Sequence, residues 1–376
     1  MRTTTRKVLK GLKGGRKMHR FNNLFAVGLS SVVFLAGATI ADAQTRELRY
    51  ADFGPDRGTR AEVLKWFDSE LRERSDGALG LDINWGGTLL GAKNAIEGVG
   101  NRAADMASVV PVYEPGKLTS WRVSDVRQIS DEYVGMMATY ELMTQSDGAA
   151  ANFEEQNVRY FANFTTGPTQ LLSREPITTP EQLEGKKIRA TGNFGVSFEA
   201  NGASAVSMSQ PDVYQALSTG TIDGTASYAY VIDSYKQYEV AQHLTLIDMG
   251  QNLGWGIVIN EDILSSLTPE QQALMSELGR DVTLYMAEKM HEARTDIMAA
   301  LREGVDGNKI QVHEGSEDLH EALVDAAEVA GESWLDMARE QGLEADTLLE
   351  RFESLVAKYR DKLDADGYPW GHGSAQ

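Results

Sequence analysis

A long stretch without proline, from Thr268 to Gly304, constrains the fold more than any other feature of the sequence. It opens with Thr268-Pro269-Glu270-Gln271, a capping Thr followed by Pro at the first helical position and Gln at the third. The stretch predicts a helix of about 35 residues, or roughly 52 Å. A lobe of about 150 residues is only about 38 Å across. Unless the helix kinks at Gly279, we expect it to run along two lobes as a brace.

The remaining chain alternates short apolar strands with helices, which predicts an α/β fold. Strands are expected at Glu47–Phe53, Leu79–Trp85 and Asp105–Val110, with amphipathic helices between them. This β-α-β-α-β order is typical of a parallel sheet with helices on both faces. The second half repeats the β-α order, and glycine-containing turns at 165–168 and 250–254 are candidate crossings between two α/β lobes.

The N-terminus has the three parts of a secretory signal peptide. The first 20 residues carry eight Lys or Arg and no acid, Leu24–Ile40 is mainly apolar, and Ala41-Asp42-Ala43 is a small-x-small cleavage site. Cleavage is therefore expected before Gln44. An uncleaved membrane anchor is the rival interpretation, but the run is short for a span and ends in the cleavage site. No membrane insertion is expected after cleavage.

Charge and cysteine content exclude several kinds of partner and chemistry. The leader removes eight basic residues and one acid from totals of 36 and 55, so the mature chain has a net charge of −26. This acidic balance argues against nucleic acid and against a basic membrane-binding surface. The chain has no Cys, which excludes disulfides, thiolate metal ligands and thiol catalysis. Its stability must then come from a large core.

The segment Pro176–Gly192 offers a candidate charged binding residue. Thr179-Pro180-Glu181-Gln182 is the pattern of a short capped helix. Lys187–Ala190 predicts a brief strand with Arg189 near its end. Ligands of open α/β sheets bind at such strand ends, and a guanidinium matches a carboxylate with two parallel hydrogen bonds. From these residues alone a surface ion pair is the preferred interpretation, because most Arg side chains are solvated.

No catalytic or metal-binding pattern stands out. The sequence has no G-x-S-x-G, P-loop or G-x-G-x-x-G motif, and no His residues three or four apart as in zinc sites. In so acidic a chain no pair of carboxylates can be singled out as a glycosidase pair. An exported enzyme is therefore a minor alternative, and neither a cofactor nor a metal is predicted.

Aromatic and amide side chains at predicted strand ends and turns are the remaining candidates for ligand contact. They are Phe53, Trp85, Tyr113, Gln210, Tyr228 and Trp255. Two lobes with an aromatic-lined cleft and one buried Arg would form a site for a small acid. Taken singly, each aromatic ring is better explained by packing in the core.

Motifs over most of the mature chain point to one family. They are Tyr50-Ala51-Asp52, Gly91 with Gly98, Ala104-Asp105-Met106, the segment from Pro176 to Arg189, Pro211-x-x-Tyr214-x-Ala216-Leu217 and Gly220-x-x-Asp223-Gly224. With the long helix, they resemble the solute-binding subunits of tripartite ATP-independent periplasmic (TRAP) transporters of the dicarboxylate-type class. The resemblance implies a two-lobe, type II-like periplasmic binding protein clamshell that closes on a small organic anion.

The resemblance also implies site residues and partners. In the family, the Arg of the G-x-K-I-R segment pairs with the ligand carboxylate, and this position is Arg189. Other family ligand positions fall on Gln210 and Ser227, and near Tyr113 and Phe53. The loaded periplasmic subunit would deliver its ligand to a small and a large membrane permease subunit that use an ion gradient. A sensor subunit for a membrane receptor kinase is the open alternative.

Two departures from the family pattern bear on the ligand. Some members carry a second Arg just before the 170–173 strand, where this chain has Gly167-Pro168-Thr169, and the usual Asn is Ser227. A second carboxylate-clamping Arg is thus not evident, which disfavours sialic-acid-type and dicarboxylate ligands. A monocarboxylate, aromatic or hydroxylated, or a sulfonate would fit one Arg with aromatic neighbours.

The crossings predict a domain division. Its parts are a signal peptide at 1–43 with Met18 as an alternative start, lobe 1 at 44–166 with about 253–285, lobe 2 at 167–252 with about 286–345, and a C-terminal helix and tail at 346–376.

Overall fold

The computed structural model describes residues 45–371. The predicted signal peptide lies outside the described residues. None of the helices within 45–371 combines the length and the apolar character that crossing a membrane requires.

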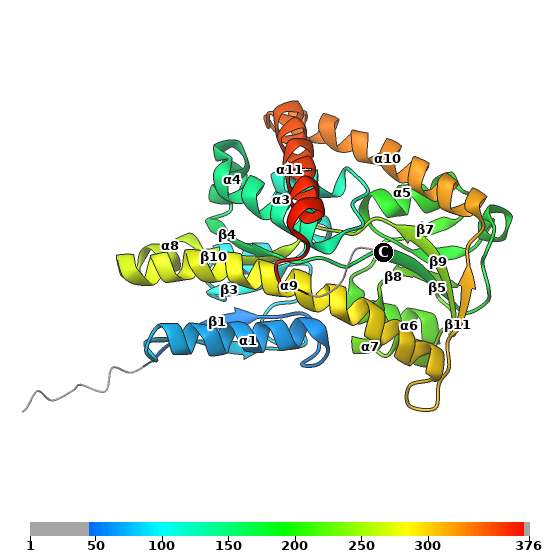
Figure 1. Cartoon of the computed structure of the whole chain (residues 1–376), viewed down its shortest axis with the longest axis horizontal. Coiled ribbons are helices and arrows are strands. Elements are labelled where there is room, and N and C mark those ends of the chain that lie inside the picture. The colour runs from blue at the N-terminus through cyan, green and yellow to red at the C-terminus, as the bar shows by residue number, and fades with distance from the viewer. Residues whose placement is uncertain (1–44, 372–376) are drawn as a thin grey trace, which may run out of the picture. The chain divides into compact units, whose positions relative to one another are not determined.

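The described residues form two β-sheets flanked by helices, which confirms the α/β prediction (Figure 1). The first sheet has the order β2-β1-β3-β10-β4 and the second has the order β11-β9-β5-β8-β6-β7. The strands are β1 (Arg46–Ala51), β2 (Leu79–Asn84), β3 (Met106–Val109), β4 (Val158–Asn163), β5 (Thr169–Ser173), β6 (Lys187–Arg189), β7 (Ser204–Val206), β8 (Gly224–Ser227), β9 (His243–Met249), β10 (Gly256–Asn260) and β11 (Gln311–Glu314).

Helices cover the sheets and connect their strands. They are α1 (Thr59–Arg74), α2 (Ala95–Gly100), α3 (Glu132–Gln145), α4 (Asp147–Glu154), α5 (Gly192–Ala200), α6 (Val213–Ser218), α7 (Ala229–Ser234), α8 (Glu261–Ser265), α9 (Pro269–Glu303), α10 (Glu317–Glu340) and α11 (Ala345–Asp366). In the first sheet β1 runs parallel to both β2 and β3, as the β-α-β-α-β order predicts. The carboxyl ends of these strands therefore meet at one edge of the sheet.

The two predicted crossings carry the chain between the sheets and lie side by side. The first joins β4 to β5, and the second joins β9 to β10. The amide of Asn252 donates to Thr166 Oγ1 at 2.9 Å, and the amide of Phe164 donates to the carbonyl of Trp255 at 2.9 Å. Polar backbone in these buried segments is thus paired, as its desolvation requires.

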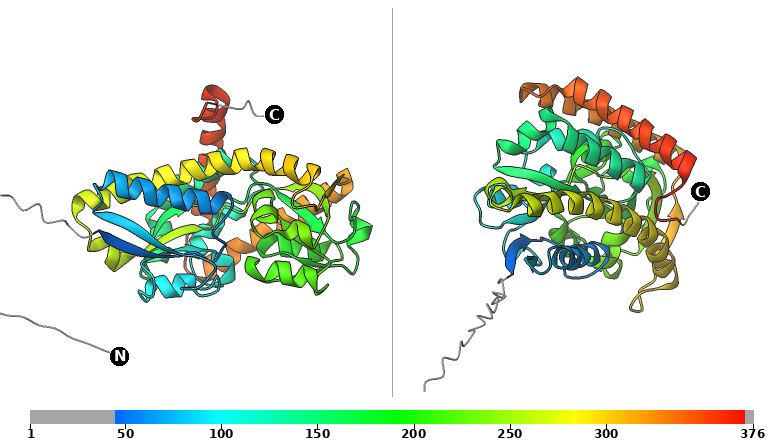
Figure 2. Two further views of the ribbon diagram at one scale, coloured as in Figure 1. Left: turned by 90° about the horizontal axis from the view of Figure 1, so that it is seen from below. Right: turned by 60° about the vertical axis from the view of Figure 1, so that its left-hand side comes forward.

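Helix α9 is continuous over 35 residues and confirms the predicted brace. Its residues from Met275 to Met290 pack into the core of the first sheet, and Leu301 packs into a core of the second. Figure 2 shows the helix passing along both sheets. Gly279 does not interrupt it; a Cβ atom there would lie 2.4 Å from the carbonyl oxygen of Phe161. The glycine therefore permits close contact between α9 and β4.

Helix α10 connects the two cores, and α11 packs on the first core alone. Leu323 of α10 packs against the second sheet, whereas Trp334 of the same helix belongs to the core of the first. Helix α11 packs against α3, where Lys358 and Tyr359 each bond Glu141 at 2.7 Å.

Strand β8 and helix α7 are absent from the sequence-based prediction. Strand β8 consists of Gly224-Thr225-Ala226-Ser227, and all four residues are buried. Without polar and apolar alternation, so short a segment carries no period-2 signal. It nevertheless pairs with both β5 and β6 near the middle of the second sheet.

Candidate functional site

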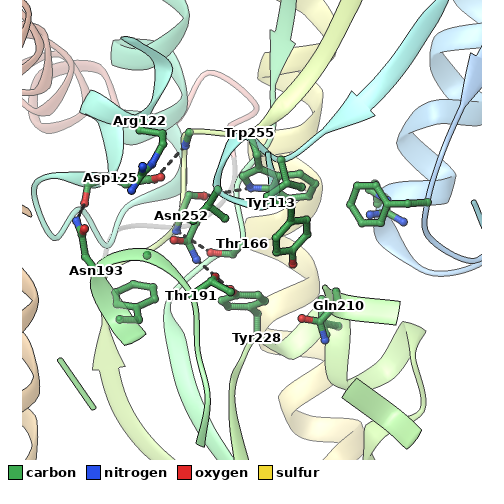
Figure 3. A pocket seen from close by; sticks show the side chains of 18 of the residues that line it. Tyr113, Arg122, Asp125, Thr166, Thr191, Asn193, Gln210, Tyr228, Asn252 and Trp255 are labelled. Atoms are coloured by element: carbon green, nitrogen blue, oxygen red, sulfur yellow. Dashed lines mark hydrogen bonds between the residues drawn. The ribbon is translucent and has the colours of Figure 1, made fainter. Parts of the chain in front are cut away.

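A cavity lies at the edge where strand ends of both sheets meet the two crossings (Figure 3). About 840 Å³ of space lies within its lining, and this figure includes open solvent because the cavity is partly open. Much of its lining is aromatic: Phe53, Tyr113, Phe194, Tyr228, Tyr230, Tyr235, Trp255 and Trp334.

Arg189 is directly behind this lining, at the end of β6, with 1% of its surface exposed. Its Nε and Nη2 donate to the carbonyl of Met208 at 3.1 and 2.9 Å, and Nη2 also donates to the hydroxyl of Tyr113 at 2.8 Å. The phenol of Tyr228 also interacts with this guanidinium, but among the described residues no carboxylate pairs with it. A buried cation without a carboxylate is costly unless a ligand compensates it.

The surroundings of Arg189 keep it charged. Burial by itself lowers the pKa of Arg189, but the phenol oxygens of Tyr113 and Tyr228 outweigh burial, so the pKa is raised. Burial also raises the pKa of Tyr228 to about 12. At neutral pH the guanidinium is therefore cationic and the Tyr228 hydroxyl keeps its proton.

Hydrogen-bond donors gather around this end of the cavity. Tyr113 ends a 3₁₀ turn after β3 and reaches Arg189 with its hydroxyl. The hydroxyl of Tyr228, which follows β8, accepts from Asn252 Nδ2 at 2.9 Å. Both phenols accept bonds from behind and can donate into the cavity. Gln210 is buried, and its Nε2 has no partner among the described residues.

Phe53 and Trp255 form part of the aromatic wall. Phe53 follows β1 and lies beneath the guanidinium of Arg60, whose carbon is 4.8 Å from the ring centre. Trp255 precedes β10 and packs edge-to-face on Phe164 at 5.1 Å. Both are buried, so they serve the core and the cavity together.

The structure does not bring Ser227 or Trp85 to the cavity. Ser227 is the last residue of β8, and neighbouring strand residues point to opposite faces. Tyr228 faces the cavity, whereas the Ser227 hydroxyl donates to Gln237 Oε1 at 2.7 Å. Trp85 follows β2, an edge strand of the first sheet, and its ring lies under the ammonium group of Lys65 instead.

Several polar lining residues lacked a signal in the sequence. Arg60 is buried, and its Nη2 donates to Asp52 Oδ1 at 2.8 Å. Arg122 and Asp125 belong to the 3₁₀ segment Thr119–Asp125, which shows no helical or strand periodicity. Thr166 and Asn252 could have been proposed because they lie in the predicted crossings, and Thr191 because it lies in the segment Pro176–Gly192. Within residues 45–371, no three His, Asp or Glu side chains are placed to hold a metal ion.

Sequence comparison finds one family over most of the chain. The family DctP, described as "Bacterial extracellular solute-binding protein, family 7", matches residues 50–339. The chain is also 26% identical over 207 residues to the ectoine-binding periplasmic protein of Halomonas elongata. That match covers 54% of this chain and 58% of the relative, so it spans less than two thirds of the relative's length.

Solved structures share the fold. One is a TRAP periplasmic solute-binding protein of Bordetella bronchiseptica with bound (R)- and (S)-mandelate, with a TM-score of 0.73, 20% identity, and coverage of 84% of this chain and 99% of that one. Another is a TRAP solute-binding protein of Rhodoferax ferrireducens with benzoate, with a TM-score of 0.72, 18% identity, and coverage of 85% and 99%. The two-lobe clamshell prediction is thereby confirmed.

Proposed function

The chain belongs to family 7 of the bacterial extracellular solute-binding proteins, the solute-binding family of TRAP transporters, and we propose that it captures a small organic monoanion for a membrane permease. The family serves transport and is not a class of enzymes. The proposal therefore includes release of the ligand unchanged. It also includes the periplasm as the site of action and a small and a large membrane subunit as the docking partners.

The observation that carries the proposal is the state of Arg189. This guanidinium is 1% exposed and has hydroxyl and carbonyl partners, but no carboxylate among the described residues. A ligand carboxylate can pair with this cation and accept from the hydroxyls of Tyr113 and Tyr228. Because the guanidinium is buried, the ion pair would be stronger than in bulk water.

The cavity favours a single carboxylate on a flat or aromatic body. Arg60, the second buried guanidinium, already pairs with Asp52, which neutralises its charge within the protein. The aromatic lining provides apolar surface for a ring. Two structural neighbours hold mandelate and benzoate, which are aromatic monocarboxylates. Those ligands are accordingly the first probes for this chain.

The first experiment is a thermal-shift screen with benzoate and mandelate, using succinate as the dicarboxylate comparison. A ligand at a hundredfold over its Kd stabilises the folded state by about 2.7 kcal/mol. Arg189→Ala is then expected to lower the affinity of the best ligand by about 2–5 kcal/mol in calorimetry. Arg174→Ala, an exposed Arg of the same lobe, is the matched control.

Arg189→Lys is the second variant. It keeps the positive charge but lacks the planar guanidinium, so it shows how much of the affinity depends on the charge alone. With both proteins folded, Arg189→Lys is expected to retain more affinity for the ligand than Arg189→Ala. Equal affinity in wild type and Arg189→Ala would overturn the assignment. Recovery of a chemically altered ligand would contradict a purely transporting role.

A further inference from the structure

A second group of polar side chains lies at the other end of the cavity from Tyr113 and Gln210. Figure 3 shows Arg122, Asp125 and Asn193 together on one side, with Tyr113 and Gln210 on the opposite side. Tyr113 bonds Arg189, so the carboxylate-binding end is the opposite one. A ligand anchored at Arg189 would therefore extend toward Arg122 and Asp125.

Arg122 lines this end of the cavity and has few partners within the protein. Among the described residues it forms no ion pair, and its one hydrogen bond runs from Nη1 to the sulfur of Met337 at 3.8 Å. Burial lowers the pKa of Arg122, and this is partly offset by Asp125. Arg122 still donates at neutral pH, because an arginine remains protonated in proteins.

Asp125 presents an acceptor beside this donor. Its Oδ1 accepts from the amides of Leu253 at 2.7 Å and Gly254 at 2.9 Å. No described residue donates to its Oδ2. The Asp125 carbonyl accepts from Asn193 Nδ2 at 2.9 Å, so the second lobe closes this end. Burial raises the pKa of Asp125, and the two amides and Arg122 oppose that change.

The charges at the cavity define which chemical groups fit. Three arginines and two aspartates lie in or beside the lining: Arg60, Arg122, Arg189, Asp52 and Asp125. Their net charge is +1, which one ligand carboxylate neutralises. At the far end a second carboxylate would face Asp125, and an ammonium would face Arg122. A hydroxyl can accept from Arg122 and donate to Asp125 at once.

We propose that Arg122 and Asp125 form a specificity subsite for a hydroxyl group, so that the ligand is a monocarboxylate with a hydroxyl remote from its carboxylate. This inference rests on the proposed function. It restricts the ligand from any small organic monoanion to one that also carries a hydroxyl. It assigns Arg122 as a specificity-determining residue, although no local pattern in the sequence marks it.

The test compares matched ligand pairs by calorimetry: benzoate with 4-hydroxybenzoate, and phenylacetate with 4-hydroxyphenylacetate. The wild type is expected to prefer the hydroxylated member of the better-binding pair by about tenfold or more, because hydrogen bonds to charged groups are strong. In Arg122→Gln this ratio is expected to fall to about twofold or less. 1,4-Phenylenediacetate, with a second carboxylate, is expected to bind more weakly than 4-hydroxyphenylacetate.

Arg127→Gln is the control variant. Arg127 lies on the loop after the same 3₁₀ segment but pairs with Glu353 at 2.7 Å, away from the cavity. The Arg127→Gln protein should therefore prefer the hydroxylated ligand by the same factor as the wild type. Thermal unfolding without ligand checks that Arg122→Gln is folded, and Arg122→Lys, which keeps a donor, should retain part of the preference.

The outcomes separate the two proposals. A wild type that binds both members of each pair equally, or an Arg122→Gln protein that keeps the preference, overturns the subsite while leaving the role of Arg189 standing. If none of these acids stabilises the wild type, the proposed function fails for this ligand class, and the subsite fails with it.

Discussion

Arg189 and its neighbours show how a buried charge is held ready for a ligand. The Tyr113 hydroxyl and the Met208 carbonyl accept hydrogen bonds from two of its nitrogens, and no carboxylate among the described residues pairs with it. Neutral partners lower the cost of burying the cation but do not neutralise it. A ligand carboxylate therefore gains a strong ion pair without displacing a protein carboxylate.

Tyr113→Phe tests the hydroxyl that reaches across to Arg189. Affinity for the carboxylate ligand is expected to fall by about 1.5 kcal/mol, roughly tenfold, because a hydrogen bond to a charged group is lost. Titration calorimetry gives the value. Tyr140→Phe is the control, since its hydroxyl bonds the carbonyl of Ser276 far from the cavity. An unchanged Kd in Tyr113→Phe would remove Tyr113 from the site.

Ser227→Ala tests two roles for Ser227. The family resemblance implies that Ser227 contacts the ligand, whereas in the structure it bonds another buried side chain. The Ser227 hydroxyl bonds the buried Gln237, so its loss is expected to lower the free energy of unfolding by about 1–3 kcal/mol and leave ligand affinity unchanged. Urea unfolding and calorimetry together measure both quantities. Weaker binding with unchanged stability would return Ser227 to the ligand site.

At the scale of secondary structure, contacts between elements outweigh helix propensity. Gly279 is in the middle of α9 and touches β4, where a methyl group would meet the Phe161 carbonyl at 2.4 Å. Gly148 is also helical, in the first turn of α4, but a Cβ atom there would come no nearer than 4.0 Å to a neighbour, Ser146 Oγ. Glycine is thus required for close packing at one position in a helix, whereas at the other no packing contact requires it.

Gly279→Ala is expected to destabilise the protein by about 1–3 kcal/mol through overpacking, although Ala favours helices. Gly148→Ala is the matched variant and should stabilise by about 0.5–1 kcal/mol, because only propensity changes there. Chemical unfolding at one temperature compares them. Stabilisation of equal size in both variants would show that α9 can shift away from β4 without cost.

The attachment of α11 to α3 predicts a pH dependence. Burial raises the pKa of Glu141, but the bonds from Lys358 and Tyr359 outweigh it, so the pKa is lowered from its ordinary value of 4.5. A carboxyl with a lowered folded pKa contributes stability that is present above pH 4.5 and is lost as pH falls through the folded pKa.

Glu141→Gln is accordingly expected to be less stable than wild type at pH 7, with the difference shrinking below pH 4.5. Urea unfolding across this range measures the difference. A constant difference at every pH would show that the loss comes from packing and not from the carboxylate.

At the scale of the whole described chain, a few hydrogen bonds join the lobes across the cavity. Arg57 Nε donates to the Ser234 carbonyl at 2.6 Å, and Asn193 donates to the Asp125 carbonyl at 2.9 Å. Arg57 does not line the cavity. Bonds of this kind favour the closed conformation, in which both lobes contact the ligand. The apparent affinity for the ligand rises with the fraction of the protein in that conformation.

Arg57→Ala is expected to weaken ligand binding by about 1 kcal/mol, roughly fivefold, without touching the ligand. Calorimetry measures the affinity, and small-angle X-ray scattering should show a larger ligand-free radius of gyration than in wild type. Arg46→Ala is the control, because Arg46 bonds Ser266 within the first lobe. Wild-type affinity in Arg57→Ala would show that this bond does not influence closure.

Much of the architecture could be predicted because its signals are local. The cap at Thr268, the absence of Pro until Gly304 and the apolar strands at 47–53 and 79–85 predicted the elements that α9, β1 and β2 supply. Strand β8 was missed because its four small, buried residues have no period, and its pairing with β5 and β6 stabilises it from outside.

The sequence by itself determined the α/β class, the two crossings and the position of Arg189 at a strand end, since caps, breakers and periodicity act within a few residues of the chain. Only the tertiary structure decided which polar side chains face the cavity. Tyr228 points inward and Ser227 outward because strand pairing selects the face, and Arg122 meets the cavity because segments distant in sequence pack together there. Such long-range contacts leave no local pattern for a sequence to reveal.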